Sequence, residues 1–316
     1  MFNNSARLSP KKTMPWLIHL ALLAGGMSIL TACQTIDPEM YAAAQNIKTF
    51  TFDQAETTNR HVYTETPIGE LDEYLVRLKT RPLVFQNILI TKPAAPKAVV
   101  ILFEGGKGLL EFTVDDATLT MSDYLSNFLV RTRRDFANKE LIAVVADAPS
   151  DMYLGLWDMR TTQDHLADIS VVVKYLRGQF KLPVWLVGTS RGTESAAFYA
   201  INGESKIEGL VLTSTVSDSD KLGKGVSDMR VASLSVPVLL VHHEQDNCIA
   251  TSFQSAQKLH SKLKEVGKSI PRLELKSFAG GRKPISPPCE ALSLHGFYGI
   301  EKEVARHIAG FIERSR

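Results

Sequence analysis

The sequence lacks a strong charge imbalance, a phosphate-loop signature and more than a few cysteines. Among its 316 residues, 36 Lys and Arg stand against 34 Asp and Glu, which leaves a net charge of +2 at pH 7. A chain so close to neutral has little attraction for polyanions, so we expect no nucleic-acid partner. The glycine-rich stretch at 104–108 lacks the Gly-Lys-Ser/Thr ending of a phosphate loop, which disfavours that alternative, and we expect no cofactor.

The N-terminus has a hydrophobic run that is short for a membrane-spanning helix. Arg7, Lys11 and Lys12 precede an apolar run at 16–30, in the order typical of a secretory signal. The run ends in Leu-Thr-Ala before Cys33, which resembles the lipobox of bacterial lipoproteins. By that resemblance Cys33 becomes the lipid-carrying N-terminus of the mature chain, with an uncleaved anchor or a plain signal peptide as alternatives.

The lipobox interpretation divides the chain into three parts. Residues 1–33 are the signal, residues 34–60 are a polar tether, and residues 61–316 are the folded domain, which is long enough for one substantial core. The resemblance implies a lipid-anchored protein of the cell envelope whose membrane partner is reached through the anchor. Gln34 follows the cysteine, which favours the outer membrane if the source is Gram-negative.

The central motif is a serine between two glycines at a change of hydrophobic pattern. Residues 188–192 read Gly-Thr-Ser-Arg-Gly, after an apolar strand pattern and before a helical pattern with small residues. Glycines at 188 and 192 let strand and helix pass closely, which presents Ser190 above the sheet. An ordinary strand-to-helix turn is the alternative.

This motif resembles the nucleophile elbow of the α/β-hydrolase fold family, and the resemblance extends from about residue 85 to the end. It implies an α/β fold with a mostly parallel, doubly wound sheet and helices on both faces. Hydrophobic patterns predict strands and helices that suit this fold. The expected strands are 74–79, 87–91, 98–103, 141–146, 182–187, 207–213 and 236–241, and the expected helices include 121–136 and 162–176. Only about twenty residues separate the last two strands, which predicts little or no lid.

In the resembled family the order along the chain is serine, acid, histidine. Asp246 follows the strand at 236–241 and is the expected acid, with Asp218 and Asp220 after the preceding strand as the alternative. Among eight histidines, His295 occupies a loop after the acid and before the last helix, so it is the expected base. A metal site at the adjacent His242 and His243 is disfavoured, since neighbouring side chains on a strand point to opposite faces.

The resemblance also implies an oxyanion hole made of two backbone N–H groups. One comes from Gly106 or Lys107 in the glycine-rich stretch and the other from Arg191, directly after the serine. The loop at 147–157 is expected to line the pocket in this family, through Asp151, Met152, Tyr153 and Trp157, although local turn structure is the alternative role.

Two further groups of residues have open interpretations. Arg131, Arg133 and Arg134 gather at the end of a predicted helix, where they form a solvated face or cap, or bind an anionic substrate. With Cys33 acylated, Cys248 and Cys289 remain as a pair in a compartment that permits disulfides. A bond between them would join the loops of Asp246 and His295, and two buried free thiols are the alternative.

The sequence therefore predicts a serine hydrolase that acts on a small acyl substrate, with no metal. Ser190 attacks, His295 moves the proton, Asp246 orients the imidazole, and the expected product is an acyl-enzyme cleared by water. Carboxylic esters are the first expectation, with amide, thioester or lactone hydrolysis and acyl transfer as alternatives. A non-catalytic envelope lipoprotein that uses the scaffold for binding is a second class, because a fold does not by itself imply a function.

Overall fold

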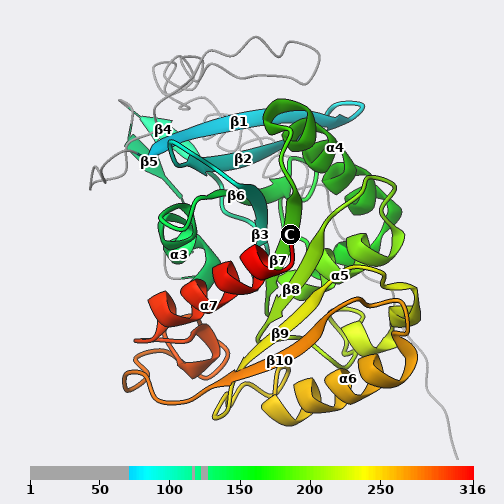
Figure 1. The fold of residues 1–316 in the computed structure, drawn as a ribbon. Coiled ribbons are helices and arrows are strands. Elements are labelled where there is room, and N and C mark those ends of the chain that lie inside the picture. The colour runs from blue at the N-terminus through cyan, green and yellow to red at the C-terminus, as the bar shows by residue number, and fades with distance from the viewer. Residues whose placement is uncertain (1–70, 116–117, 122–126) are drawn as a thin grey trace, which may run out of the picture. The chain divides into compact units, whose positions relative to one another are not determined.

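The computed structural model describes residues 71–115, 118–121 and 127–316 (Figure 1). The expected signal and lipobox with Cys33, the tether at 34–60 and the first ten residues of the expected domain lie outside this described part. Among the described helices, none combines the length and the apolar character that a membrane crossing requires.

The core is an eight-stranded sheet in the order β1-β2-β6-β3-β7-β8-β9-β10. All pairings from β6 to β10 along this order are parallel, whereas β1 and β2 run antiparallel to their neighbours. The strands are β1 Asp72–Arg81, β2 Val84–Lys92, β3 Ala98–Phe103, β6 Leu141–Pro149, β7 Val184–Thr189, β8 Gly209–Thr213, β9 Val238–His243 and β10 Leu273–Phe278. A small hairpin of β4 Thr113–Asp115 and β5 Thr118–Thr120 stands apart from this sheet.

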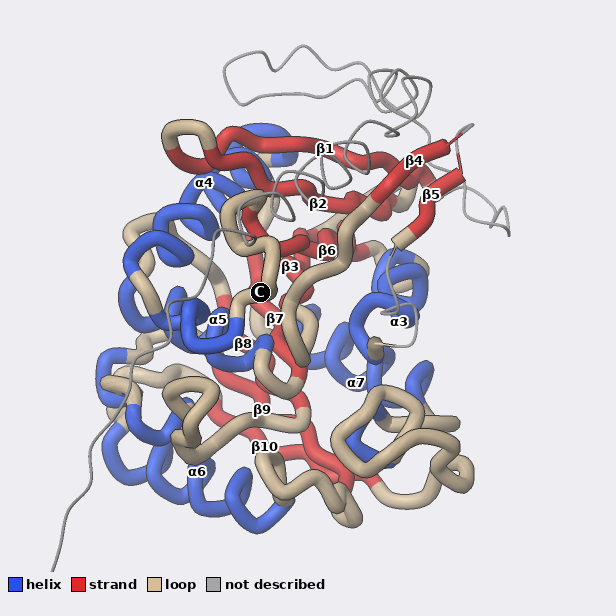
Figure 2. Tube along the Cα trace, turned by 180° about the vertical axis from the view of Figure 1, so that it is seen from behind, coloured by secondary structure: helices blue, strands red, loops and turns tan. Residues whose placement is uncertain are grey.

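Helices cover both faces of the sheet (Figure 2). Helices α4 Gln163–Phe180, α5 Gly192–Asn202 and α6 Phe253–Val266 lie on one face, and α3 Phe128–Ala137 and α7 Glu301–Arg314 lie on the other. The connections contain the short 3-10 helices η3 Trp157–Thr161, η4 Val226–Asp228, η5 Val231–Ser233 and η6 Leu294–Gly296. The α/β fold with a mostly parallel sheet and helices on both faces is confirmed.

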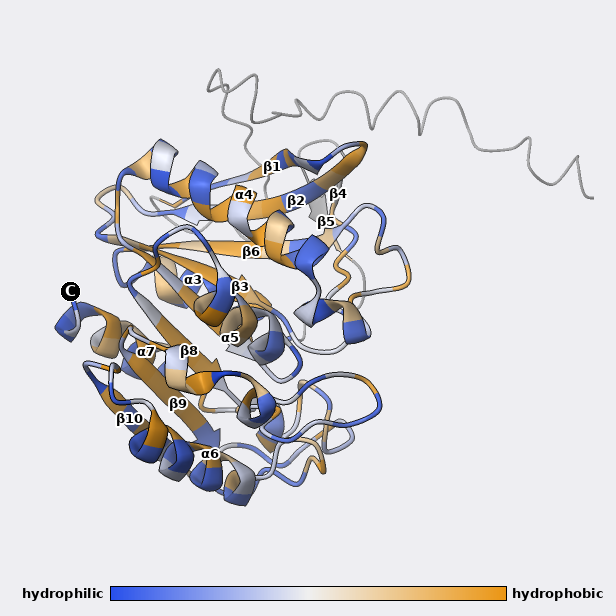
Figure 3. Ribbon diagram, turned by 90° about the vertical axis from the view of Figure 1, so that its right-hand side faces the viewer, coloured by the Kyte–Doolittle hydropathy of each residue, from blue (hydrophilic) through white to orange (hydrophobic). Residues whose placement is uncertain are grey.

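The central strands are apolar because both of their faces are covered. Every residue of β3 is buried, and its side chains alternate between the two cores: Val99, Ile101 and Phe103 face one, while Ala98, Val100 and Leu102 face the other. The strands β8 and β9 show the same hydrophobic character, whereas α6 alternates apolar and polar residues (Figure 3). Burial on two faces explains why continuous apolar runs predicted these strands.

Strand β10 was not predicted from the sequence. It pairs only with β9 at the edge of the sheet, and five of its six residues remain partly or fully exposed. An edge strand needs no continuous apolar run, so the hydrophobic pattern in this segment was weak. The connection between β8 and β9 contains only η4 and η5, which agrees with the expected absence of a large insertion there.

Candidate active site

Ser190 occupies a sharp turn between β7 and α5. Its φ of +50° lies in the left-handed region, which is strained for a residue with a side chain. A Cβ added at Gly192 would overlap the carbonyl oxygen of Phe103, and one at Gly188 would overlap the backbone of Gly192. The two flanking glycines therefore permit the close crossing of β3, β7 and α5 that the sequence motif predicts.

His295 and Asp246 are joined directly. Nδ1 of His295 lies 2.9 Å from Oδ2 of Asp246, and both residues are buried. Asp246 follows β9 and His295 lies on η6, so the pair joins two loops that are 49 residues apart in the chain. A carboxylate only accepts hydrogen bonds, so the proton is assigned to Nδ1, and Nε2 is then an acceptor.

The carboxylate of Asp246 has two further donors. The backbone N–H of Cys248 donates to Oδ1 and the Thr251 hydroxyl donates to Oδ2, each over 2.9 Å. Thr251 Oγ1 also lies 2.9 Å from Nδ1 of His295, so this threonine contacts both members of the pair. Thr251 was not predicted from the sequence, because nothing in its local pattern separates it from an ordinary loop threonine.

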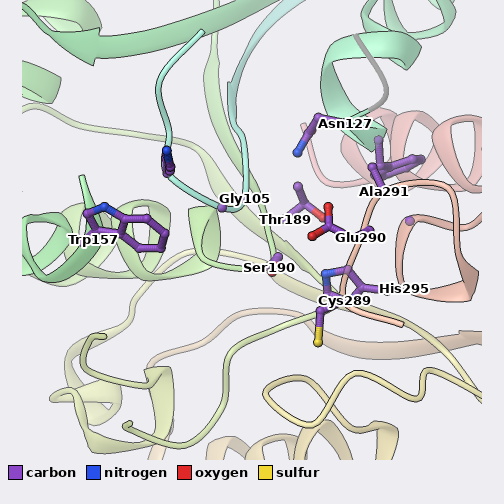
Figure 4. Close-up of a pocket in the computed structure, with 13 residues that line it drawn as sticks. Gly105, Asn127, Trp157, Thr189, Ser190, Cys289, Glu290, Ala291 and His295 are labelled. Atoms are coloured by element: carbon purple, nitrogen blue, oxygen red, sulfur yellow. The ribbon is translucent and has the colours of Figure 1, made fainter. Parts of the chain in front are cut away.

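Ser190 and His295 line the same cavity, which has a volume of about 350 Å³ (Figure 4). No hydrogen bond joins these two described residues, and such bonds are often long until a substrate is bound. The lining residues are Gly105, Gly106, Lys107, Asn127, Phe128, Trp157, Thr189, Ser190, Cys289, Glu290, Ala291, His295 and Gly296. A serine hydroxyl and an imidazole thus share one solvent-accessible space.

The glycine-rich loop at 104–108 packs against the serine. A Cβ on Gly105 would lie 2.8 Å from Cβ of Ser190, so only glycine permits this contact. The carbonyl of Gly105 accepts from the N–H of Gly108, and the carbonyl of Lys107 accepts from the N–H of Leu156. By contrast, among the described residues no acceptor is found for the N–H groups of Gly106, Lys107 and Arg191. These are the groups that the family resemblance assigns to an oxyanion hole.

The alternative acids, Asp218 and Asp220, bind residues other than His295. Asp220 pairs with the Arg191 side chain, and Asp218 accepts a hydrogen bond from Ser255 over 3.0 Å. Glu244 accepts from the Ser277 hydroxyl. Of the acids that follow β8 and β9, Asp246 is therefore the one placed against His295.

The adjacent histidines have structural partners. Nε2 of the buried His242 accepts from the backbone N–H of Thr215 over 2.7 Å, and burial lowers the pKa of His242 to about 3. His243 contacts the carbonyl of Gly280 over 2.9 Å. Within the described ranges, no group of three or more His, Cys, Asp or Glu side chains is arranged as a metal site.

The arginine cluster forms ion pairs within the fold. Arg133 and Arg134 both contact the carboxylate of Glu73 on β1. Arg131 donates to the carbonyl of Gly296 over 2.5 Å and contacts Glu301. These contacts favour the structural interpretation over an anionic-substrate site, and Arg131 additionally holds the backbone directly after His295.

The loop after β6 contributes one lining residue of the four expected. Trp157 lines the cavity, whereas Tyr153 is largely exposed and Asp151 pairs with Arg81. The N–H of Met152 donates to the carbonyl of Pro149 in a local turn. Local turn structure therefore accounts for most of this segment.

Among the lining residues that were not predicted from the sequence, Asn127 and Glu290 carry polar side chains. Oδ1 of Asn127 caps α3 by accepting from the N–H of Leu129, which leaves the amide nitrogen of Asn127 on the other side of its planar group (Figure 4). The sequence analysis places residue 127 inside an expected helix at 121–136, whereas the structure has α3 begin after it, so its place at the cavity was not predicted. Glu290 follows Cys289 in an irregular loop and has no sequence signal of its own.

A disulfide joins Cys248 to Cys289. Cys248 is buried two residues after Asp246, while Cys289 is exposed and lines the cavity. The bond thus links the Asp246 loop to the chain that leads into His295, as the sequence predicts. Closing a loop with a sequence separation of 41 stabilises the fold by up to about 4 kcal/mol in the chain-entropy description.

Comparisons with known proteins show a fold similarity without a close relative. No protein-family model and no curated protein sequence matches the chain. Three solved structures each match over 78% of this chain. A cold-adapted esterase from an Arctic intertidal metagenomic library is 14% identical and matches over 96% of its own length, with a TM-score of 0.50. An α/β serine hydrolase homologue from Coxiella burnetii (15% identity, 99% of its length, TM-score 0.52) and a dienelactone hydrolase from Anabaena variabilis (13% identity, 99% of its length, TM-score 0.53) match in the same way. The chain therefore has an α/β-hydrolase-like fold.

We predict that mild reduction of the Cys248–Cys289 bond lowers the reactivity of Ser190 before it unfolds the protein. Loosening the two loops disturbs the His295–Asp246 pair, while the sheet and its two cores remain intact. Fluorophosphonate labelling and far-UV circular dichroism, recorded over increasing thiol concentrations, should therefore change at different concentrations. The double variant Cys248→Ser, Cys289→Ser provides the control. Unchanged labelling in that variant would restrict the disulfide to a role in stability.

Proposed function

We propose that this protein is a serine hydrolase that cleaves small carboxylic esters through Ser190, His295 and Asp246. The single observation that carries the proposal is the buried His295–Asp246 pair, whose histidine lines the same cavity as a serine on a strained elbow. A serine hydroxyl is a weak nucleophile at neutral pH and needs a base that is held in the correct tautomer. In this proposal Ser190 supplies the hydroxyl, His295 the base, and Asp246 the carboxylate that holds its tautomer.

In the proposed mechanism, Oγ of Ser190 attacks the carbonyl carbon while Nε2 of His295 takes the hydroxyl proton. The carbonyl π electrons move to oxygen, and the N–H groups of Arg191 and of Gly106 or Lys107 stabilise the oxyanion. The oxyanion then collapses, the bond to the alcohol breaks, and His295 returns the proton to the leaving oxygen. Water repeats the sequence on the acyl-enzyme and regenerates Ser190. Asp246 stabilises the imidazolium in both halves.

The cavity supports a small substrate with an apolar portion. Its volume of about 350 Å³ lies near the lower end of ordinary ligand sites. Phe128 and Trp157 supply aromatic surface, while Lys107 and Glu290 supply charge at the same cavity. The similarity to an esterase and to a dienelactone hydrolase supports ester or lactone chemistry at the level of the fold. Amide and thioester hydrolysis and acyl transfer use the same parts.

We also propose that the chain is lipid-anchored in the cell envelope through Cys33. This proposal rests on the order of basic residues, apolar run and Leu-Thr-Ala-Cys in the first 33 residues. An exported protein also suits the disulfide, since such bonds persist in oxidising compartments.

The variant Ser190→Ala should lose fluorophosphonate labelling, and its ester turnover should fall by several orders of magnitude. Its melting temperature should change little, because the alanine retains Cβ and removes only the hydroxyl. Labelling with mass-spectrometric identification of the modified peptide tests this in the full chain. Equal labelling of both proteins would refute the nucleophile, and an inert wild type would favour a non-catalytic binding role.

The variant Asp246→Asn should reduce turnover by a factor on the order of ten thousand, as expected when an amide favours the wrong imidazole tautomer. Asp218→Asn is the matched control, since that carboxylate bonds Ser255 on the surface. The kcat of each variant on a soluble chromogenic ester is the measurement. A larger loss in the control would place the acid after β8.

The variant Cys33→Ala should abolish the incorporation of a labelled fatty acid and change the processing of the chain. The acyl group has no thiol to join in this variant. Metabolic labelling and N-terminal mass spectrometry of the mature protein measure both effects. A wild-type N-terminus without lipid would contradict the anchor.

A further inference from the structure

A buried arginine lies beneath the glycine-rich loop. Arg160 lies on η3 and is 1% exposed. Its Nη2 donates to the carbonyl oxygen of Gly106, and its Nη1 donates to Oγ of Ser195 on α5, each over 3.1 Å. One guanidinium therefore connects the loop after β3 to the helix after the elbow.

The bond to Gly106 orients a peptide group beside the serine. In a trans peptide the carbonyl and the following N–H point in opposite directions. Because the Gly106 carbonyl points to Arg160, the N–H of Lys107 points away from Arg160. Gly106 and Lys107 both line the cavity with Ser190. Arg160 thus determines which way this candidate oxyanion donor faces.

Gly108 provides the space that the guanidinium occupies. A Cβ at this position would lie 2.7 Å from Nη2 of Arg160 and 2.7 Å from Cδ1 of Leu156. The N–H of Leu156 additionally donates to the carbonyl of Lys107 over 2.6 Å. The segment that carries Arg160 therefore holds the loop at two successive carbonyls.

The other branch of the guanidinium is anchored on α5. Oγ of Ser195 accepts from Arg160 and lies 3.0 Å from Nε2 of His165 on α4. All three side chains are buried, and burial, followed by the nearby charge of Arg160, lowers the pKa of His165 to about 3. Arg191 precedes the first residue of the same helix, so a fixed Ser195 also fixes the position of the Arg191 N–H.

Two buried carboxyl groups, those of Glu104 and Glu194, lie near Arg160. Burial raises the pKa of Glu104 and of Glu194, and attraction to Arg160 opposes that rise in both. A buried guanidinium without such surroundings would be strongly destabilising. The arginine is therefore part of a buried polar cluster directly behind the site.

We propose that Arg160 is a positioning residue that sets the separation between the two halves of the oxyanion hole. The planar guanidinium donates from two nitrogens at a fixed spacing, which an ammonium group does not reproduce. It holds the Lys107 N–H through Gly106 and the Arg191 N–H through Ser195 and α5. This inference rests on the proposed hydrolase function and adds to it a residue that does not touch the substrate.

The test compares Arg160→Met, Arg160→Lys and Ser195→Ala in the full chain, with Arg177→Met as the matched control. Arg177 lies on α4 and pairs with Glu208, away from the loop. For each protein, kcat and KM are measured on a soluble chromogenic ester. Inhibition constants are measured for a trifluoromethyl ketone, which forms a tetrahedral adduct with an oxyanion, and for an unreactive amide of similar shape.

Arg160→Met should lower kcat by about a hundredfold, the effect of misplacing a transition-state contact. KM and amide binding should stay within about twofold, while trifluoromethyl ketone binding weakens by the same factor as kcat, because only the tetrahedral species carries the oxyanion. Arg160→Lys and Ser195→Ala should show smaller, parallel losses. The control should match the wild type.

Two results would overturn the proposal: kcat unchanged in the arginine variants, or a fall in kcat without weaker ketone binding. Melting temperatures identify a folding failure. If Arg160→Met does not fold, Arg160→Lys and Ser195→Ala test the proposal instead, by whether kcat and trifluoromethyl ketone binding fall together. The Ser190→Ala variant tests the hydrolase function separately. If the wild type is active and the Arg160 variants keep the same kcat, only the positioning role of Arg160 is refuted and the hydrolase function stands.

Discussion

The close crossing of β3, β7 and α5 is the constraint on which the site depends. The first residue of α5 touches the carbonyl that ends β3, and no side chain fits between them. At this crossing the turn residue Ser190 lies in the left-handed region, and the glycine-rich loop packs against it. The strained conformation persists because the buried central strands and α5 hold it from both sides. Ser190 and the glycine-rich loop are thus held together by close backbone packing.

The parallel sheet explains how the remaining residues reach the serine. Parallel strands end at the same edge, so the loops after β3, β7 and β9 meet there, and the chain after β10 returns to the same edge before α7. His295 lies on that return, where no strand positions it. Its backbone is held instead by Ser214, which donates to its carbonyl over 2.6 Å, and by Arg131 on the following residue. The disulfide adds a covalent link between the same loops.

Polar residues beneath the site differ in character from the two apolar cores. Arg160, His165, Glu194 and Ser195 are each almost completely buried. Burying polar groups is costly unless they find partners, so their presence here needs a compensating network. Hydrogen bonds from Arg160 to Ser195 and to Gly106, and a contact between Ser195 and His165, connect the loop after β3 with α4 and α5. Such a cluster favours one arrangement of the surrounding backbone over others.

The sequence by itself determined the features that depend on local patterns. Continuous apolar runs predicted the doubly covered strands, and the spacing of glycines around Ser190 predicted the elbow. The order of acid and histidine along the chain selected Asp246 and His295, which the fold then brought within 2.9 Å. Only the tertiary structure decided the contacts of Thr251, Asn127 and Arg160, and the presence of the edge strand β10. Arg160 and Gly106 are 54 residues apart, and a contact over such a separation leaves no local periodicity. The edge strand likewise lacks a second covered face, and with it the apolar run by which buried strands are recognised.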